Sequence, residues 1–312
     1  MTAAALVVLQ VVAPIFAIIF AGYLAASRSF IDAAGFRGLN SFAFSLAAPA
    51  LLFASGTAGY QGGGGAALAF FLGVAILYVV TLFGARRFGL PLATSGAVAL
   101  DVTFGNTVMM GIPIIVAGFG QAGLSVLLAI LALHSVLLLG TATVVAEIAQ
   151  NQKAAPLKLL GATITGVARN PVVMAVLAAL VWNALALPVP GVARTTLQML
   201  GAAAPPVALF CLGGSLNGFD ARAGWRQTGI TVALKLTALP AIVWIITHLM
   251  GLAPLEVAVA VTTAALPTGA NAFLLARRYA SGADTSGAAV LISTVLSIVT
   301  LSVLLAIYAG AR

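Results

Sequence analysis

The chain has 312 residues, of which 62% are hydrophobic and only 6% are charged, and its mean hydropathy is +1.17. A soluble domain carries about 25% charged residues, so this composition excludes a water-soluble globule as well as an intrinsically disordered chain. The single cysteine, Cys211, excludes a disulfide-stabilised scaffold, and the net charge of +8 comes from basic residues scattered between apolar segments, which is typical of membrane topology rather than of nucleic-acid binding.

Apolar stretches long enough to cross the hydrocarbon core of a bilayer follow one another along the chain. Ten of them are expected, at about 4–26, 37–58, 66–85, 94–117, 122–146, 169–187, 196–217, 226–250, 255–276 and 286–308. Backbone polar groups in lipid must be satisfied within helices or closed barrels, and no ten-residue alternating pattern indicates strands. The sequence therefore predicts an all-α polytopic membrane protein with ten transmembrane helices and lipid as its surroundings.

The basic residues between these stretches are distributed unevenly. Eleven lie in the connections after the odd-numbered stretches: Arg28, Arg37, Arg86, Arg87, Lys153, Lys158, Arg169, Arg222, Arg226, Arg277 and Arg278. On the other side lie Arg194 and Arg312, while Lys235 falls within a stretch. Because cytoplasmic loops are enriched in Lys and Arg, we expect both termini outside the cell (inner) membrane.

Matching prolines indicate an internal duplication. Pro14 aligns with Pro171 at an offset of 157 residues, as does Pro49-Ala50-Leu51-Leu52-Phe53 with Pro206-Val207-Ala208-Leu209-Phe210, and Pro113 aligns with Pro267 at an offset of 154. Residues 1–148 and 169–312 then form two five-helix repeats joined by a cytoplasmic linker at 149–168. Since each repeat has an odd number of helices, the two repeats have inverted topology.

The fourth and ninth stretches each carry a proline among Gly, Thr and Asn residues. Pro113 ends the segment Phe104–Pro113, and Pro267 lies within Ala265–Asn271. A proline inside a helix frees backbone polar groups, which lipid does not satisfy. Paired, interrupted helices in two halves of a chain are typical of the binding site of a secondary transporter. The alternative is a pair of ordinary proline kinks.

The residues quoted so far, with several others, resemble the auxin efflux carrier family. The chain resembles its bacterial branch, which is related to the plant PIN carriers and to malonate and malate carriers. The matching segments are Leu39-Asn40-Ser41-Phe42 through Phe53, Gly105-Asn106-Thr107 with Gly111-Ile112-Pro113, Arg169-Asn170-Pro171, Ala202–Leu209, and Ala264-Ala265-Leu266-Pro267. The long cytoplasmic loop of many plant members is absent.

The resemblance implies a fold shared with bile acid:sodium symporters. In that fold helices 4 and 9 unwind and cross at their prolines, and a transport domain (helices 3–5 and 8–10) slides against a scaffold (helices 1, 2, 6 and 7). The resemblance also implies a homodimer, an elevator-type mechanism and an organic anion as substrate. Asn106 matches the asparagine that contacts substrate in the PIN carriers, so it inherits that candidate role.

Half-helices that end at mid-membrane present N-termini whose partial positive charge attracts a carboxylate. The expected substrate-binding residues are those of the two interruptions: Asn106, Thr107, Pro113, Pro267, Thr268 and Asn271. Their side chains supply neutral donors and acceptors. The alternative is that they only satisfy the broken backbone.

Three ionisable residues, Asp101, His134 and Lys235, lie well inside the apolar stretches, away from their ends. Lys235 either pairs with Asp101, or extends toward the membrane surface, or helps to bind the anion, since an intramembrane charge is costly without a function. Asp101 is the main candidate for proton coupling. His134 is either a hydrogen-bonded packing residue or a coupling residue.

The sequence as a whole predicts a secondary transporter of small organic anions rather than an enzyme, with no cofactor and no metal site. Its coupling ion is left open between proton and sodium. The alternatives are a sodium-coupled symporter of the bile acid class and a membrane sensor or channel-like protein. Gly118-Phe119-Gly120-Gln121-Ala122-Gly123 fits a dinucleotide-binding pattern, but it follows an apolar stretch instead of a strand, so it predicts a turn.

Overall fold

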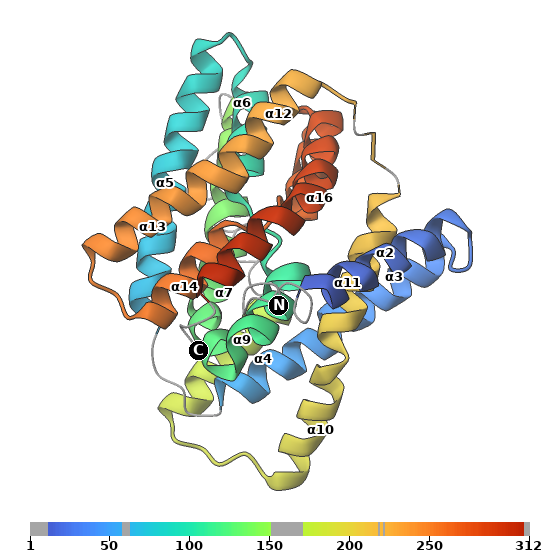
Figure 1. Cartoon of the computed structure of the whole chain (residues 1–312), viewed down its shortest axis with the longest axis vertical. Coiled ribbons are helices and arrows are strands. Elements are labelled where there is room, and N and C mark those ends of the chain that lie inside the picture. The colour runs from blue at the N-terminus through green and yellow to red at the C-terminus, as the bar shows by residue number, and fades with distance from the viewer. Residues whose placement is uncertain (1–11, 58–62, 151–170, 218, 221, 309–312) are drawn as a thin grey trace.

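The computed structural model describes residues 12–57, 63–150, 171–217, 219–220 and 222–308 (Figure 1). Within these residues every named element is helical, which confirms the all-α prediction. The predicted linker at 149–168 lies outside them, apart from its first two residues.

Among the described residues, each of the predicted apolar stretches contains helix. Six segments are individually long and apolar enough to cross a membrane: Ala33–Gly56, Gly64–Arg87, Thr107–Gln150, Gly191–Leu216, Trp225–Leu249 and Ala283–Ile307. Four apolar helices are shorter: Ala13–Ser27, Leu92–Thr103, Pro171–Ala184 and Pro254–Ala264. The described part of the chain therefore has the composition and helix lengths of a multi-pass membrane protein.

The helices form two groups. One group contains α2 (Ala13–Ser27), α3 (Ala33–Phe42), η2 (Ala43–Ala47), α4 (Ala48–Gly56), α9 (Pro171–Ala184), α10 (Gly191–Ala202) and α11 (Ala204–Leu216). The other contains α5 (Gly64–Arg87), α6 (Leu92–Thr103), η3 (Thr107–Gly111), α7 (Ile112–Gln150), α12 (Trp225–Ala233), η4 (Leu234–Ala238), α13 (Leu239–Leu249), α14 (Pro254–Ala264), α15 (Ala270–Arg278) and α16 (Ala283–Ile307). Figure 1 shows α2, α3, α10 and α11 on the right and α5 and α13 on the left. Contacts of α11 with η3 and of α4 and α9 with α7 connect the groups.

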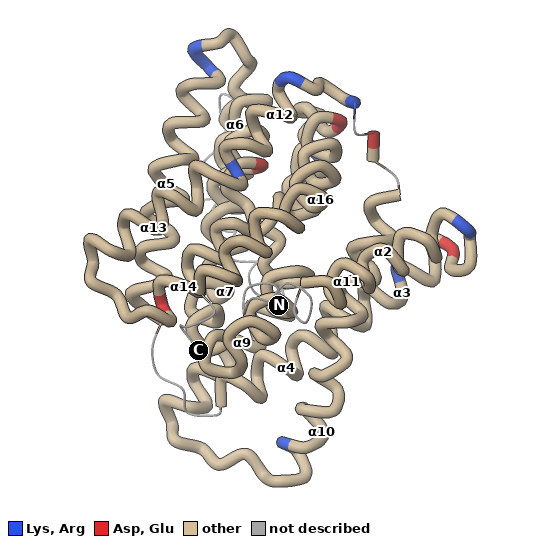
Figure 2. Tube along the Cα trace, in the orientation of Figure 1, with Lys and Arg blue, Asp and Glu red and all other residues tan. Residues whose placement is uncertain are grey.

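Charged residues lie mostly at the ends of helices, as Figure 2 shows. Arg86 and Arg87 occupy the last turn of α5, and Arg277 and Arg278 the last turn of α15. A cation at a helix C-terminus interacts favourably with the helix dipole. The long apolar bodies between these ends are free to face lipid.

Three π-helical turns occur in the described part of the chain, and each is followed by a proline. Pro49, Pro113 and Pro240 are each the second residue of the α-helix that follows η2, η3 and η4 respectively. The proline ring clashes with the carbonyl four residues earlier and supplies no N–H. A widened turn relieves that clash without ending the helix, which explains why these prolines lie inside continuous helical segments.

Two other positions do break the helices. The 94–117 stretch is interrupted at 104–106, between α6 and η3, and not at Pro113 as the resemblance implied. The 255–276 stretch is interrupted at 265–269, around Pro267, as expected. Within α7, Gly120 has φ 65° and ψ −158°, a conformation outside the helical region, where the glycine-rich segment predicted a turn.

The closest helix packing joins α2 to α11. A Cβ atom added to Gly22 would collide with the carbonyl oxygen of Phe210, and one added to Gly213 would collide with that of Ile19. Small residues let helix backbones approach closely in membranes, where dispersion contacts drive association. These two glycines therefore allow the tight contact between α2 and α11.

We expect Gly213→Ala to lower the free energy of unfolding by about 1–3 kcal/mol, because the added methyl forces the two backbones apart. Thermal unfolding of the purified protein in detergent measures this. Gly84→Ala is the matched control, since Gly84 lies in α5 with open space around it. Equal unfolding midpoints for the two variants would contradict the packing role of Gly213.

Candidate functional site

The two helix breaks pair with each other through their backbones. The backbone amide of Asn106 donates to the Pro267 carbonyl over 2.8 Å, and the backbone amide of Gly269 donates to the Phe104 carbonyl over 2.9 Å. Gly105 and Thr268 form an antiparallel bridge between these bonds. A buried backbone group without a partner is costly, so each break supplies partners that the other needs.

Thr268 attaches this crossing to two neighbouring helices. Its hydroxyl donates to the Asp101 carbonyl of α6 over 2.9 Å, and its amide donates to the Ser293 hydroxyl of α16 over 3.0 Å. The residue is fully buried. Thr268 therefore connects the crossing to α6 through its side chain and to α16 through its backbone.

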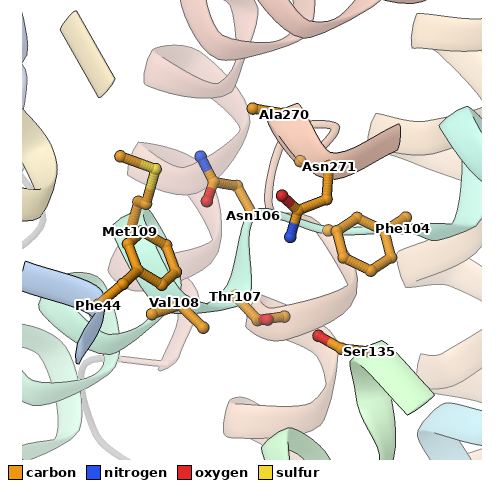
Figure 3. Close-up of a pocket in the computed structure, with 11 residues that line it drawn as sticks. Phe44, Phe104, Asn106, Thr107, Val108, Met109, Ser135, Ala270 and Asn271 are labelled. Carbon is orange, nitrogen blue, oxygen red and sulfur yellow. The ribbon is translucent and has the colours of Figure 1, made fainter. Parts of the chain in front are cut away.

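A small pocket, with a cavity volume of about 40 Å³, lies beside the crossing. Its lining combines both breaks with two neighbouring segments: Phe44, Phe104, Gly105, Asn106, Thr107, Val108, Met109, Ser135, Gly269, Ala270 and Asn271. Figure 3 shows Asn106, on the segment between α6 and η3, and Asn271, on the first turn of α15, both bordering it. All lining side chains are uncharged, so the pocket offers polar groups without a full charge.

The side-chain amide of Asn106 has no hydrogen-bond partner among the described residues. The residue is 6% exposed, and its Nδ2 atom makes no hydrogen bond within the described residues. Its backbone carbonyl accepts from the amides of Met110 and Gly111 in η3. A buried donor left unpaired loses its bond to water and costs about 1–3 kcal/mol, which a ligand that accepts from Nδ2 would offset.

The first turn of α15 adds backbone donors. Gly269 is its N-cap and makes no side-chain cap, and Ala270 and Asn271 both line the pocket. The first amides of a helix have no partner within the helix and carry its positive dipole end. Together with the side-chain amide of Asn106, these backbone amides of α15 favour the binding of an anion that has oxygen acceptors.

The Thr107 side chain contacts the buried imidazole of His134. The Thr107 hydroxyl and His134 Nδ1 are 3.4 Å apart, and the imidazole lies 4.6 Å from the Phe104 ring and 5.9 Å from the Phe70 ring, centroid to centroid. His134 is buried and does not line the pocket. The ring thus packs against two aromatic side chains and contacts Thr107.

Lys235 and Asp101 do not form the ion pair that was one of the expectations. Lys235 Nζ donates to the Ala264 carbonyl over 3.0 Å, whereas the Asp101 carboxylate accepts from the Ser286 hydroxyl over 2.6 Å. Both side chains are buried, so Lys235 does not extend to the membrane surface either. Each charge is held by a neutral partner on a different helix.

The predicted residues thus divide between pocket and support. Asn106, Thr107 and Asn271 line the pocket; Pro113, Pro267 and Thr268 are not part of its lining. Phe44 and Ser135 were missed, although Ser135 follows the noted His134 and Phe44 lies in the turn before Pro49. The sequence signal that could have indicated Phe44 is Pro49, because a proline inside a helix distorts the turn before it.

Comparison with known proteins identifies the family. Residues 7–305 match the family model described as "Membrane transport protein". The chain is also 26% identical over 302 residues to a protein of Rhizobium meliloti (strain 1021) named "Putative malonate transporter", an alignment that covers 94% of this chain and 93% of that protein. The chain belongs to the membrane transport protein family, that of the auxin efflux carriers, and is a transporter rather than an enzyme.

Proposed function

We propose that this protein is a secondary transporter of small organic anions, carboxylates in particular, that works by an elevator-type alternating-access mechanism. The observation that carries the proposal is the pocket at the crossing, which is lined both by Asn106, whose side-chain amide is unpaired, and by the uncapped first turn of α15. The name of the Rhizobium meliloti relative supports a small dicarboxylate as one substrate.

The chemistry of the lining suits binding followed by release. A carboxylate accepts hydrogen bonds from Asn106, Thr107, Asn271 and the α15 amides, all of them neutral donors. A charge-assisted hydrogen bond contributes about 1.5–3 kcal/mol. A few such bonds hold an anion with moderate affinity, and without a direct ion pair in the pocket the anion can leave again.

Ten membrane crossings in two inverted five-helix repeats fit the helix lengths. The segment Thr107–Gln150 has 44 residues, which as one straight helix would extend about 66 Å, twice the hydrocarbon thickness. We assign the non-helical position Gly120 as the division of this segment into two crossings. The short helices α6 and α14 each complete a crossing with the segment that follows their break.

An elevator mechanism fits the division of the helices into two groups. We assign α2–α4 and α9–α11 to the scaffold and the remaining helices to the transport domain. The pocket lies between them, because Phe44 of η2 faces lining residues that all come from η3, α7, α15 and the breaks. Movement of the transport domain past Phe44 would carry the bound anion across the membrane.

Topology and assembly complete the proposal. The basic residues after the odd-numbered stretches support a cell-membrane protein with both termini outside. The resemblance to the auxin efflux carriers supports a homodimer.

We expect Asn106→Ala to weaken carboxylate binding by about ten- to hundredfold, because one hydrogen bond to a charged group is lost. Calorimetric titration of the purified protein with malonate and with monocarboxylates measures the dissociation constants. Asn183→Ala is the matched control and keeps wild-type affinity, because Asn183 lies at the end of α9 and is not part of the pocket lining. An unchanged dissociation constant with a lowered unfolding midpoint would show that Asn106 is only structural.

We also expect a cysteine at position 271 to report on the pocket. Asn271 is exposed, whereas Thr268 is fully buried, so in a Cys211→Ala background Asn271→Cys reacts with a polar thiol reagent and Thr268→Cys does not. Saturating carboxylate slows the Asn271→Cys reaction at least about fivefold, because the ligand covers the first turn of α15. Labelling at the same rate with and without ligand argues against a site at Asn271.

A further inference from the structure

Lys235 is a buried cation that the proposed substrate pocket does not use. It lies in the π-helical turn η4, its side chain is 0% exposed, and it does not line the pocket. Within the described residues no carboxylate oxygen bonds to its Nζ atom, whose one hydrogen-bond partner is the Ala264 carbonyl. Placing an ammonium in a membrane interior costs free energy, so a lysine at such a position is expected to have a function.

That partner is the end of a broken helix. Ala264 is the last residue of α14, so its carbonyl has no partner within the helix and belongs to the negative end of the helix dipole. The position of a Cβ atom on Gly105 would be 3.5 Å from both Lys235 Nζ and the Thr263 carbonyl oxygen. The ammonium therefore lies at the C-terminal end of α14, next to the backbone of the opposite break.

Asp101 provides the matching negative charge at a distance. It is buried in α6, which contacts η4 and α16, and Ser286 of α16 holds its carboxylate. Its backbone carbonyl accepts from Thr268 of the crossing. One positive and one negative group are thus built into the elements around the crossing without a direct bond between them.

In secondary transporters, C-terminal ends of half-helices and unwound carbonyls are the groups that coordinate a free coupling cation. Here an ammonium on a side chain already occupies such a position. We propose that Lys235 is a tethered cation that substitutes for a free metal cation at the crossing, so that the crossing forms and binds its anion without sodium. Gly105 borders both the ammonium and the pocket, so the fixed charge also favours an anion there.

The proposal deepens the proposed function, and its transport consequence rests on it, but protein stability tests the tethered cation directly. We expect the unfolding midpoint of the wild-type protein to be the same in sodium, potassium and choline chloride at equal ionic strength. Lys235→Ala should lower the midpoint by about 5 °C or more, because the Ala264 carbonyl and Asp101 lose their compensating charge. Ethylammonium chloride should then restore at least about half of that loss by placing a small ammonium in the vacated space.

Three controls define the effect. Tetramethylammonium has the same charge but no N–H donor, so it should not stabilise Lys235→Ala. Lys235→Met fills the space without a charge and should lose stability without recovery by ethylammonium. Arg87→Ala removes an exposed cation from the end of α5 and should behave like the wild-type protein.

Two results would overturn the proposal. One is a wild-type midpoint raised specifically by sodium, which would mean that the crossing still binds a free cation. The other is equal stabilisation of Lys235→Ala, Lys235→Met and Arg87→Ala by ethylammonium. A protein that shows the expected ion responses but binds no carboxylate would retain the tethered cation and disprove the proposed function instead.

Discussion

The satisfaction of backbone hydrogen bonds at two helix breaks is the constraint on which the rest of this structure depends. A peptide group that leaves a helix inside a membrane costs several kcal/mol unless another group bonds to it. The backbone amide of Asn106 bonds to Pro267 and the carbonyl of Phe104 bonds to Gly269, so each pair joins residues more than 160 positions apart in the chain. Each break is stable only with the other in place, so the crossing, the pocket beside it and the mutual position of α6 and α15 form together.

Prolines contribute to this site indirectly. Pro49, Pro113 and Pro240 follow widened turns instead of ending helices, and the three turns bring Phe44, Thr107–Met109 and Lys235 to the neighbourhood of the crossing. A π-helical turn changes the direction of the side chains that follow it by adding one residue to the turn. The same steric effect of proline therefore occurs in three helices, next to Phe44, next to the polar residue Thr107 and next to the buried Lys235.

The sequence predicts the helices and one of the two breaks, because long apolar stretches and a proline flanked by Gly and Thr have direct physical consequences. It does not predict that the first break lies at 104–106, since that depends on hydrogen bonds to Pro267 and Gly269 that no local pattern records. Asn106, Thr107 and Asn271, which the sequence predicts as substrate-binding residues, lie beside one pocket. The sequence does not predict the hydrogen bond of Thr268 to Asp101 or that of Lys235 to Ala264. Uniformly apolar helices have no polar periodicity from which the direction of a side chain could be inferred.

The distribution of donors also bears on how the proposed mechanism can keep its affinity on both sides of the membrane. The polar groups of the pocket, Asn106, Thr107 and the first turn of α15, all belong to the proposed transport domain, whereas the proposed scaffold contributes Phe44. Displacement of one group against the other then replaces an apolar wall and leaves the hydrogen bonds to the anion unchanged. Because a ligand shifts a conformational equilibrium only by its difference in affinity for the two states, an anion bound in this way would favour neither state strongly. The movement would remain reversible, and the gradient of the anion or of a coupled ion would set its direction.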